Sequence, residues 1–140
     1  MAPRGSSSRP VSAADARAYL SKADSWLEAA TESLEARRWD VAAGAAVAAG
    51  VNACDAISGA LVGQRAGQHD LAATLLETAG EDGRFAARQL SQLLRFKAPA
   101  QYDPAPMSEK DARKAVELAR RLVERATVVV MRRPKAAPGP

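Results

Sequence analysis

The chain has 140 residues and a formal net charge of +4; 47 % of its residues are hydrophobic, 26 % are charged and only 4 % are aromatic. This length suits one domain with a real core and excludes two ordinary ones. Small side chains let helices approach closely, and few β-branched runs exist to form strands, so we predict an all-α bundle of four to five helices.

Basic residues gather at the two ends of the chain. Five of the 20 basic residues lie at the ends, and the rest of the chain has 15 basic and 16 acidic residues. The pI of about 9.6 is therefore largely a property of the ends and is weak evidence for nucleic-acid binding. We expect disordered basic tails at residues 1–11 and 131–140 around one helical domain at residues 12–130. The five residues are Arg4, Arg9, Arg132, Arg133 and Lys135.

The sequence favours a cytoplasmic protein without membrane contact. Cys54 is the only cysteine, which excludes an internal disulfide and a cysteine-based zinc site. The first ten residues lack the hydrophobic stretch of a signal peptide. The longest apolar run, Val41–Val51, is too short to span a bilayer, and Asn52 and Asp55 follow it closely. We expect no metal and no cofactor.

The first two predicted helices are long. The first helix begins at Ser12, because Ser12 and Asp15, three residues later, resemble a capping box. This helix ends near Arg37. The second helix, Trp39–Val62, is apolar almost all round, which places it at the centre of the bundle. Gly63 is the expected stop signal of the second helix.

Two shorter helices and a proline-rich segment come next. We predict helices at His69–Ala79 and Arg84–Ala98, with a glycine turn between them. Pro99 and the prolines that follow it predict a non-helical excursion. Ser108 then caps the last helix, whose inward stripe continues to Ala126. No strand pattern is found.

The outer face of the last helix is basic but is interrupted by Glu117 and Glu124. These glutamates favour an ion-paired, solvated face over a track for a phosphate backbone, and no aromatic residues accompany the basic ones to stack bases. Weak RNA or DNA contact through this helix and the basic C-terminal tail is the alternative. The basic residues are Lys110, Arg113, Lys114, Arg120, Arg121 and Arg125.

Three stretches resemble the HEPN superfamily: residues 42–56 of the alanine-rich helix, Leu94-Arg95-Phe96-Lys97 followed by Tyr102, and residues 108–115 at the start of the last helix. Their order is similar to that in HEPN proteins of high-GC bacteria, over roughly residues 12–126. The resemblance implies a helical bundle of the kind found in toxin–antitoxin and nucleotidyltransferase-associated proteins. It further implies a homodimer with a protein partner encoded nearby.

The resemblance also implies where a ribonuclease site would lie. Catalytic HEPN ribonucleases carry an Arg and a His separated by four to six residues, usually near the start of the last long helix. Here the single histidine, His69, lies well before that point, and only three residues separate it from Arg65. Arg95 and Tyr102 have suitable spacing, but a tyrosine with an ordinary pKa is a poor base at neutral pH. The departures argue against the usual ribonuclease and leave these four residues as candidates for an atypical one.

Asp55 is the discordant residue of the central helix, because a buried carboxylate is costly unless it is paired. Asn52 lies one turn before it, and Lys97 falls on the inward face of the fourth helix. We predict that Asp55 pairs with Lys97 or Arg95 and so fixes the register of the two helices. A binding pocket formed by Asn52, Asp55 and Lys97, with Tyr102 nearby, is the alternative.

The sequence therefore favours a non-catalytic HEPN-like module that engages a protein partner or nucleic acid in a bacterial stress, defence or toxin–antitoxin type system. Two alternatives stay open. One is an atypical, toxin-like HEPN ribonuclease, and the other is a helical protein that binds a small molecule or a nucleotide.

Overall fold

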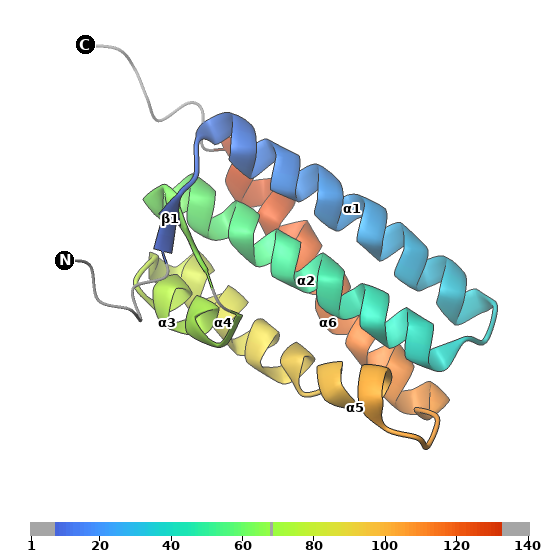
Figure 1. The fold of residues 1–140 in the computed structure, drawn as a ribbon. Coiled ribbons are helices and arrows are strands. Elements are labelled where there is room, and N and C mark those ends of the chain that lie inside the picture. The colour runs from blue at the N-terminus through green and yellow to red at the C-terminus, as the bar shows by residue number, and fades with distance from the viewer. Residues whose placement is uncertain (1–7, 68, 133–140) are drawn as a thin grey trace, which may run out of the picture.

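The computed structural model describes residues 8–67 and 69–132. The helices pack as a bundle in which α1 lies along one side of α2, α4 and α5 lie along the other side, and α6 lies behind (Figure 1). The predicted all-α bundle is confirmed. The elements are, in order, β1 (Ser8–Pro10), α1 (Ala13–Glu35), α2 (Trp39–Val62), β2 (Gln64–Ala66), α3 (His69–Glu77), α4 (Gly80–Leu94), α5 (Lys97–Tyr102) and α6 (Glu109–Arg132).

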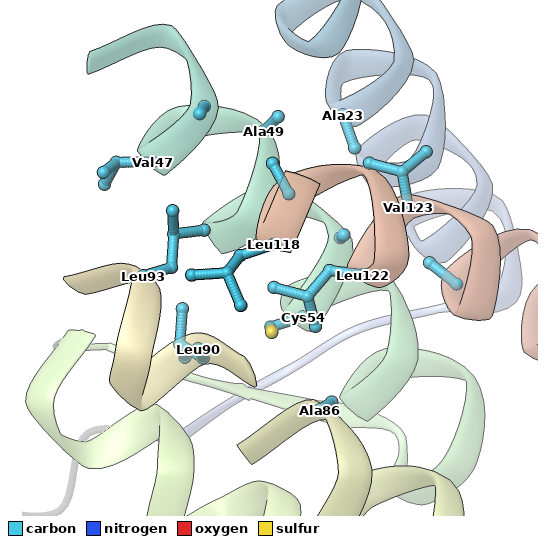
Figure 2. Packing of buried hydrophobic residues seen from close by; sticks show 14 of the residues in the cluster. Ala23, Val47, Ala49, Cys54, Ala86, Leu90, Leu93, Leu118, Leu122 and Val123 are labelled. Atoms are coloured by element: carbon cyan, nitrogen blue, oxygen red, sulfur yellow. The ribbon is translucent and has the colours of Figure 1, made fainter. Parts of the chain in front are cut away.

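The central position of α2 is confirmed by its burial. Fifteen of its 24 residues are buried, and most of them are alanine or glycine. Gly50 lies where Leu93 of α4 and Leu122 of α6 meet, so that an added Cβ would collide with Leu93. Figure 2 shows Leu90, Leu93 and Leu122 gathered beside Cys54 of α2. Small side chains on α2 therefore let the neighbouring helices bring their leucines together.

By length and composition alone, α2 is the one described helix that could cross a membrane. In its most apolar window, 67 % of the residues are buried inside the structure, and the core helix of a bundle meets the same criterion. Helices α1, α4, α5 and α6 supply the apolar surroundings.

The predicted helix ends are set by local chemistry. The Ser12 hydroxyl oxygen accepts a hydrogen bond of 3.0 Å from the Asp15 N–H at the start of α1. The Ser108 hydroxyl oxygen accepts one of 3.1 Å from the Asp111 N–H at the start of α6. Gly63 ends α2 in the left-handed region with φ 71°, which glycine adopts without strain. These three predictions are confirmed.

The expectations of no strand and of a tail at residues 1–11 are wrong for residues 8–11. Strand β1 pairs antiparallel with β2, with Arg9 opposite Arg65. The next residue, Val11, is buried, and its N–H donates a 2.8 Å hydrogen bond to the Gly63 carbonyl. Three-residue strands are too short to show an alternating pattern, so no sequence pattern predicts them. The expected disorder of residues 1–7 and 133–140 lies outside the described residues.

Several helix boundaries also differ from prediction, and the predicted helix Arg84–Ala98 ends earlier, at Leu94. Helix α4 begins at Gly80, within the expected glycine turn, and Pro99 lies inside the short helix α5 instead of starting a non-helical segment. Proline is tolerated in the first turn of a helix because its missing N–H would have no partner within the helix. Helix α6 runs to Arg132, two residues beyond the predicted domain end.

Candidate functional site

Asp55 faces a different cation from the ones predicted. It is only 9 % exposed, and burial raises its pKa to about 6, while the nearby Arg65 guanidinium acts to lower it. Within the described ranges Asp55 forms no ion pair with Lys97 or Arg95. The predicted pairing is therefore wrong; Arg65 is the cation that acts on Asp55, and it offsets only part of the effect of burial on the pKa.

Arg65 reaches this position because β2 turns back along the end of α2 to pair with β1. Its guanidinium carbon lies 5.8 Å from the centroid of the Tyr19 ring on α1, and its Nη1 donates a 3.3 Å hydrogen bond to the Ala66 carbonyl. Cation–π contact and charge thus join α1, α2 and β2 around one arginine. No local sequence pattern signals this arrangement.

The proposed partner of Asp55 on its own helix is also engaged elsewhere. The Asn52 amide nitrogen Nδ2 donates a 2.9 Å hydrogen bond to the Ala48 carbonyl of the same helix. Lys97 is half-buried at the start of α5. Within the described part of the chain, no hydrogen bond or ion pair links Asn52, Asp55 and Lys97, and a pocket formed by these residues stays a prediction.

The two candidate ribonuclease pairs have different settings. Arg95 is exposed at the C-terminal end of α4, and Tyr102, with 73 % exposure, is the last residue of α5. They therefore lie at opposite ends of α5. Arg65 makes the structural contacts described above, and His69 is the first residue of α3, with a side chain outside the described part of the structure.

Neither thiol chemistry nor metal binding has support in the described residues. Cys54 is buried, and burial together with the neighbouring Asp55 carboxylate raises its pKa, which makes the thiol inert. No group of three or more His, Cys, Asp or Glu residues that could hold a metal ion occurs among the described residues.

A surface between α4 and α6 carries a cluster that the sequence analysis missed. The Arg125 guanidinium carbon lies 4.0 Å from the centroid of the Phe85 ring, and Nη1 donates a 2.8 Å hydrogen bond to Asp82. Arg132 donates a second one, of 2.5 Å, to the other Asp82 oxygen. Burial acts to raise the pKa of Asp82, but the hydrogen bonds from Arg125 and Arg132 outweigh it and lower the pKa.

The same surface contains a shallow hollow of about 200 Å³. Two large apolar side chains of α6 are exposed beside this cluster: Val128 by 54 % and Met131 by 64 %. Gln89 lies buried nearby on α4. It follows Asp82 by seven residues and therefore lies on the same face of the helix. Its Oε1 atom has no hydrogen-bond partner among the described residues. The hollow is lined by Phe85, Arg121, Glu124, Arg125 and Val128.

Further along α6, the predicted ion-paired face is confirmed. Arg113 pairs with Glu109 at 2.8 Å, and Arg120 and Arg121 both pair with Glu117 at 3.3 Å. All these side chains are between 41 % and 58 % exposed, so each pair contributes little to stability.

The described residues form a small all-α bundle whose surface carries exposed apolar and charged side chains. A model of the HEPN domain matches residues 16–129. The chain belongs to the HEPN domain family, whose members commonly occur in defence and toxin–antitoxin systems. No curated protein gives a match to the chain.

Proposed function

We propose that this chain is a non-catalytic HEPN-domain interaction module of a bacterial stress, defence or toxin–antitoxin type system. The observation that carries the proposal is the setting of Arg65. Its guanidinium is engaged with the Tyr19 ring, the Ala66 carbonyl and the charge of Asp55. These contacts hold α1, α2 and β2 together through Arg65, which favours a structural role for this arginine over membership of an Arg/His ribonuclease pair.

The second candidate pair also lacks an activating partner. Tyrosine acts as a general base at neutral pH only when its surroundings make it more acidic. In residues 8–67 and 69–132 no hydrogen bond to the Tyr102 hydroxyl occurs, and the side chain extends into solvent with 73 % exposure. This setting favours contact with another molecule over proton transfer.

Contacts with other molecules would use the exposed surface of the described chain, which includes six large apolar side chains. We propose that the module works in the cytoplasm as a homodimer and engages a protein encoded nearby, with RNA contact only weak. The exposed residues are Trp26, Val41, Val62, Tyr102, Val128 and Met131.

The proposal is tested by incubating the purified chain with end-labelled single-stranded RNA, beside the variants His69→Ala, Arg95→Ala and Tyr102→Phe. We expect no cleavage above the buffer blank for any of the four proteins. Cleavage by the natural chain that is lost in one of the variants would overturn the proposal and establish an atypical ribonuclease. Light scattering on the same samples measures the expected dimer.

A further inference from the structure

Residues 8–11, which we call the strap, are held to the bundle at few points. All three residues of β1 are exposed, and only Val11, at 7 % exposure, enters the core. A Cβ added to Gly59 of α2 would lie 2.5 Å from the Val11 Cγ1 atom, so the absence of a Cβ on Gly59 leaves the hole that Val11 fills. The Val11 N–H donates a 2.8 Å hydrogen bond to the Gly63 carbonyl, and the pairing of β1 with β2 adds the other backbone contacts.

Arg9 is an unfavourable residue at its position in the strap. It lies directly opposite Arg65 of β2, and like charges directly opposite each other on paired strands are destabilising. Arg65 has a nearby opposite charge, because its guanidinium acts to lower the pKa of Asp55. Arg9 forms no ion pair within the described part of the chain. An uncharged residue at the position of Arg9 would therefore lie opposite Arg65 more favourably than Arg9 does.

The outer edge of β1 is closed to a further strand. Because the Val11 N–H points toward the Gly63 carbonyl, the residues before and after Val11 direct their backbone groups away from β2. Pro10 occupies such an outward position, and it has no N–H to offer a neighbouring strand. A strand added on this side of β2 must therefore take the place of β1.

The few contacts of the strap favour its opening ahead of the bundle. Segments held by few buried contacts open at a lower free energy than the one that unfolds the whole domain. The strap has one buried side chain, whereas α2 alone has fifteen buried residues. Opening of the strap would uncover the edge of β2, the Gly63 carbonyl and the hole at Gly59.

Resting on the interaction role proposed above, we infer that the strap is displaceable and that an extended segment of a partner protein takes its place on β2. The backbone of this segment pairs with Gln64–Ala66, a β-branched aliphatic side chain fills the hole at Gly59, and an uncharged residue lies opposite Arg65. The strap itself displays this mode of strand addition, because its own backbone and its own valine occupy the same positions. Its arginine makes it the weaker of the two occupants.

The test locks the strap in the full chain with a disulfide. Pro10 and Gln64 lie opposite each other and are both exposed, so Pro10→Cys/Gln64→Cys leaves the hole at Gly59 and the side chain of Arg65 unchanged. In a pair of this type the Cα atoms lie about 4.5 Å apart, which suits a disulfide. Cys54 is buried with a raised pKa, so it does not compete in thiol exchange. Circular dichroism verifies that the oxidised and reduced forms are folded.

Fluorescence anisotropy measures the Kd of a fluorescein-labelled peptide with the sequence of residues 6–13 and threonine in place of Arg9. We expect saturable binding to the reduced double variant and binding at least about tenfold weaker to the oxidised form. In the natural chain, Val11→Ala should tighten binding, because it weakens the competing strap and leaves the hole intact. Val128→Ala, which shortens an exposed valine on α6, is the matched control and should leave the Kd unchanged.

Equal binding to the oxidised and reduced forms, or no saturable binding to the reduced form, would overturn the inference. So would undiminished binding of a peptide with aspartate in place of its valine. A peptide with the unchanged sequence that binds as tightly as the threonine peptide would assign the site to the strap of a second copy instead of a partner protein. RNA cleavage by the same preparation would overturn the non-catalytic role but leave the peptide result standing, so the two failures are distinguishable.

Discussion

At the scale of single residues, Asp55 on α2 has an unfavourable environment for its charge. It is 9 % exposed and its pKa is raised from 3.8 to about 6, because lost hydration outweighs the attraction of Arg65. The folded state therefore holds a proton at pH values where the unfolded chain has released it. Stability from this residue is greatest below pH 4 and falls as the pH rises from about 4 to about 6.

Replacing Asp55 by asparagine removes this penalty. We expect Asp55→Asn to be more stable than the natural chain at neutral pH, by at most about 3 kcal/mol, with the difference disappearing near pH 4. Urea unfolding followed by circular dichroism at both pH values measures the change. Asp24→Asn, which alters an exposed carboxylate on α1, is the control and should show no such dependence. An Asp55→Asn protein less stable than the natural chain at neutral pH would show that the carboxylate stabilises the fold.

At the scale of elements, the glycines decide how closely helices approach. A Cβ added to Gly83 in α4 would collide with the Leu76 backbone carbonyl in α3, and a backbone cannot move aside as a side chain can. A Cβ added to Gly44 in α2 would meet nothing within 4 Å. The same substitution should therefore act in opposite directions at the two positions.

We expect Gly83→Ala to lower the free energy of unfolding by about 2 kcal/mol, because it forces α3 away from α4. Gly44→Ala should raise it by about 0.5–1 kcal/mol, because alanine loses less entropy than glycine in a helix. Thermal and urea unfolding of the two variants side by side measure both values. Equal effects of the two changes would contradict the close packing of α3 on α4.

At the scale of the whole molecule, the β1–β2 pair ties the N-terminal end of the described chain to the bundle. Val11 is buried against Gly59 of α2 and donates a hydrogen bond to the Gly63 carbonyl. Its side chain therefore belongs to the same core as those of the helices. A change there should weaken the entire fold, because small single domains unfold in one cooperative step.

We expect Val11→Ala to destabilise the protein by about 1–2 kcal/mol, in proportion to the methyl groups lost from the core. Fluorescence of Trp26 and Trp39 and circular dichroism of all helices should shift together in urea. An early fluorescence transition separate from the loss of helicity would show that β1 and α1 form a unit that unfolds independently.

The candidate sites show where sequence reasoning ends. The sequence indicated that Asp55 needs compensation, since one carboxylate stands out on an apolar helix. It could not indicate Arg65, because the position of Arg65 depends on pairing between two three-residue strands. It also placed Arg125 on an outer face without finding Asp82, 43 residues earlier in the chain.

The sequence by itself determined the long helices α1, α2 and α6, the caps at Ser12 and Ser108, the stop at Gly63 and the central position of α2. These features arise from residues within one or two helical turns of each other, so the interactions that cause them are between residues close together in the sequence. Tertiary structure alone decided the β1–β2 pair, the contact of Arg65 with Tyr19, and the two arginines on Asp82. Those contacts depend on how the helices and strands pack against one another. The periodic pattern of the sequence does not predict which residues far apart in the chain come into contact.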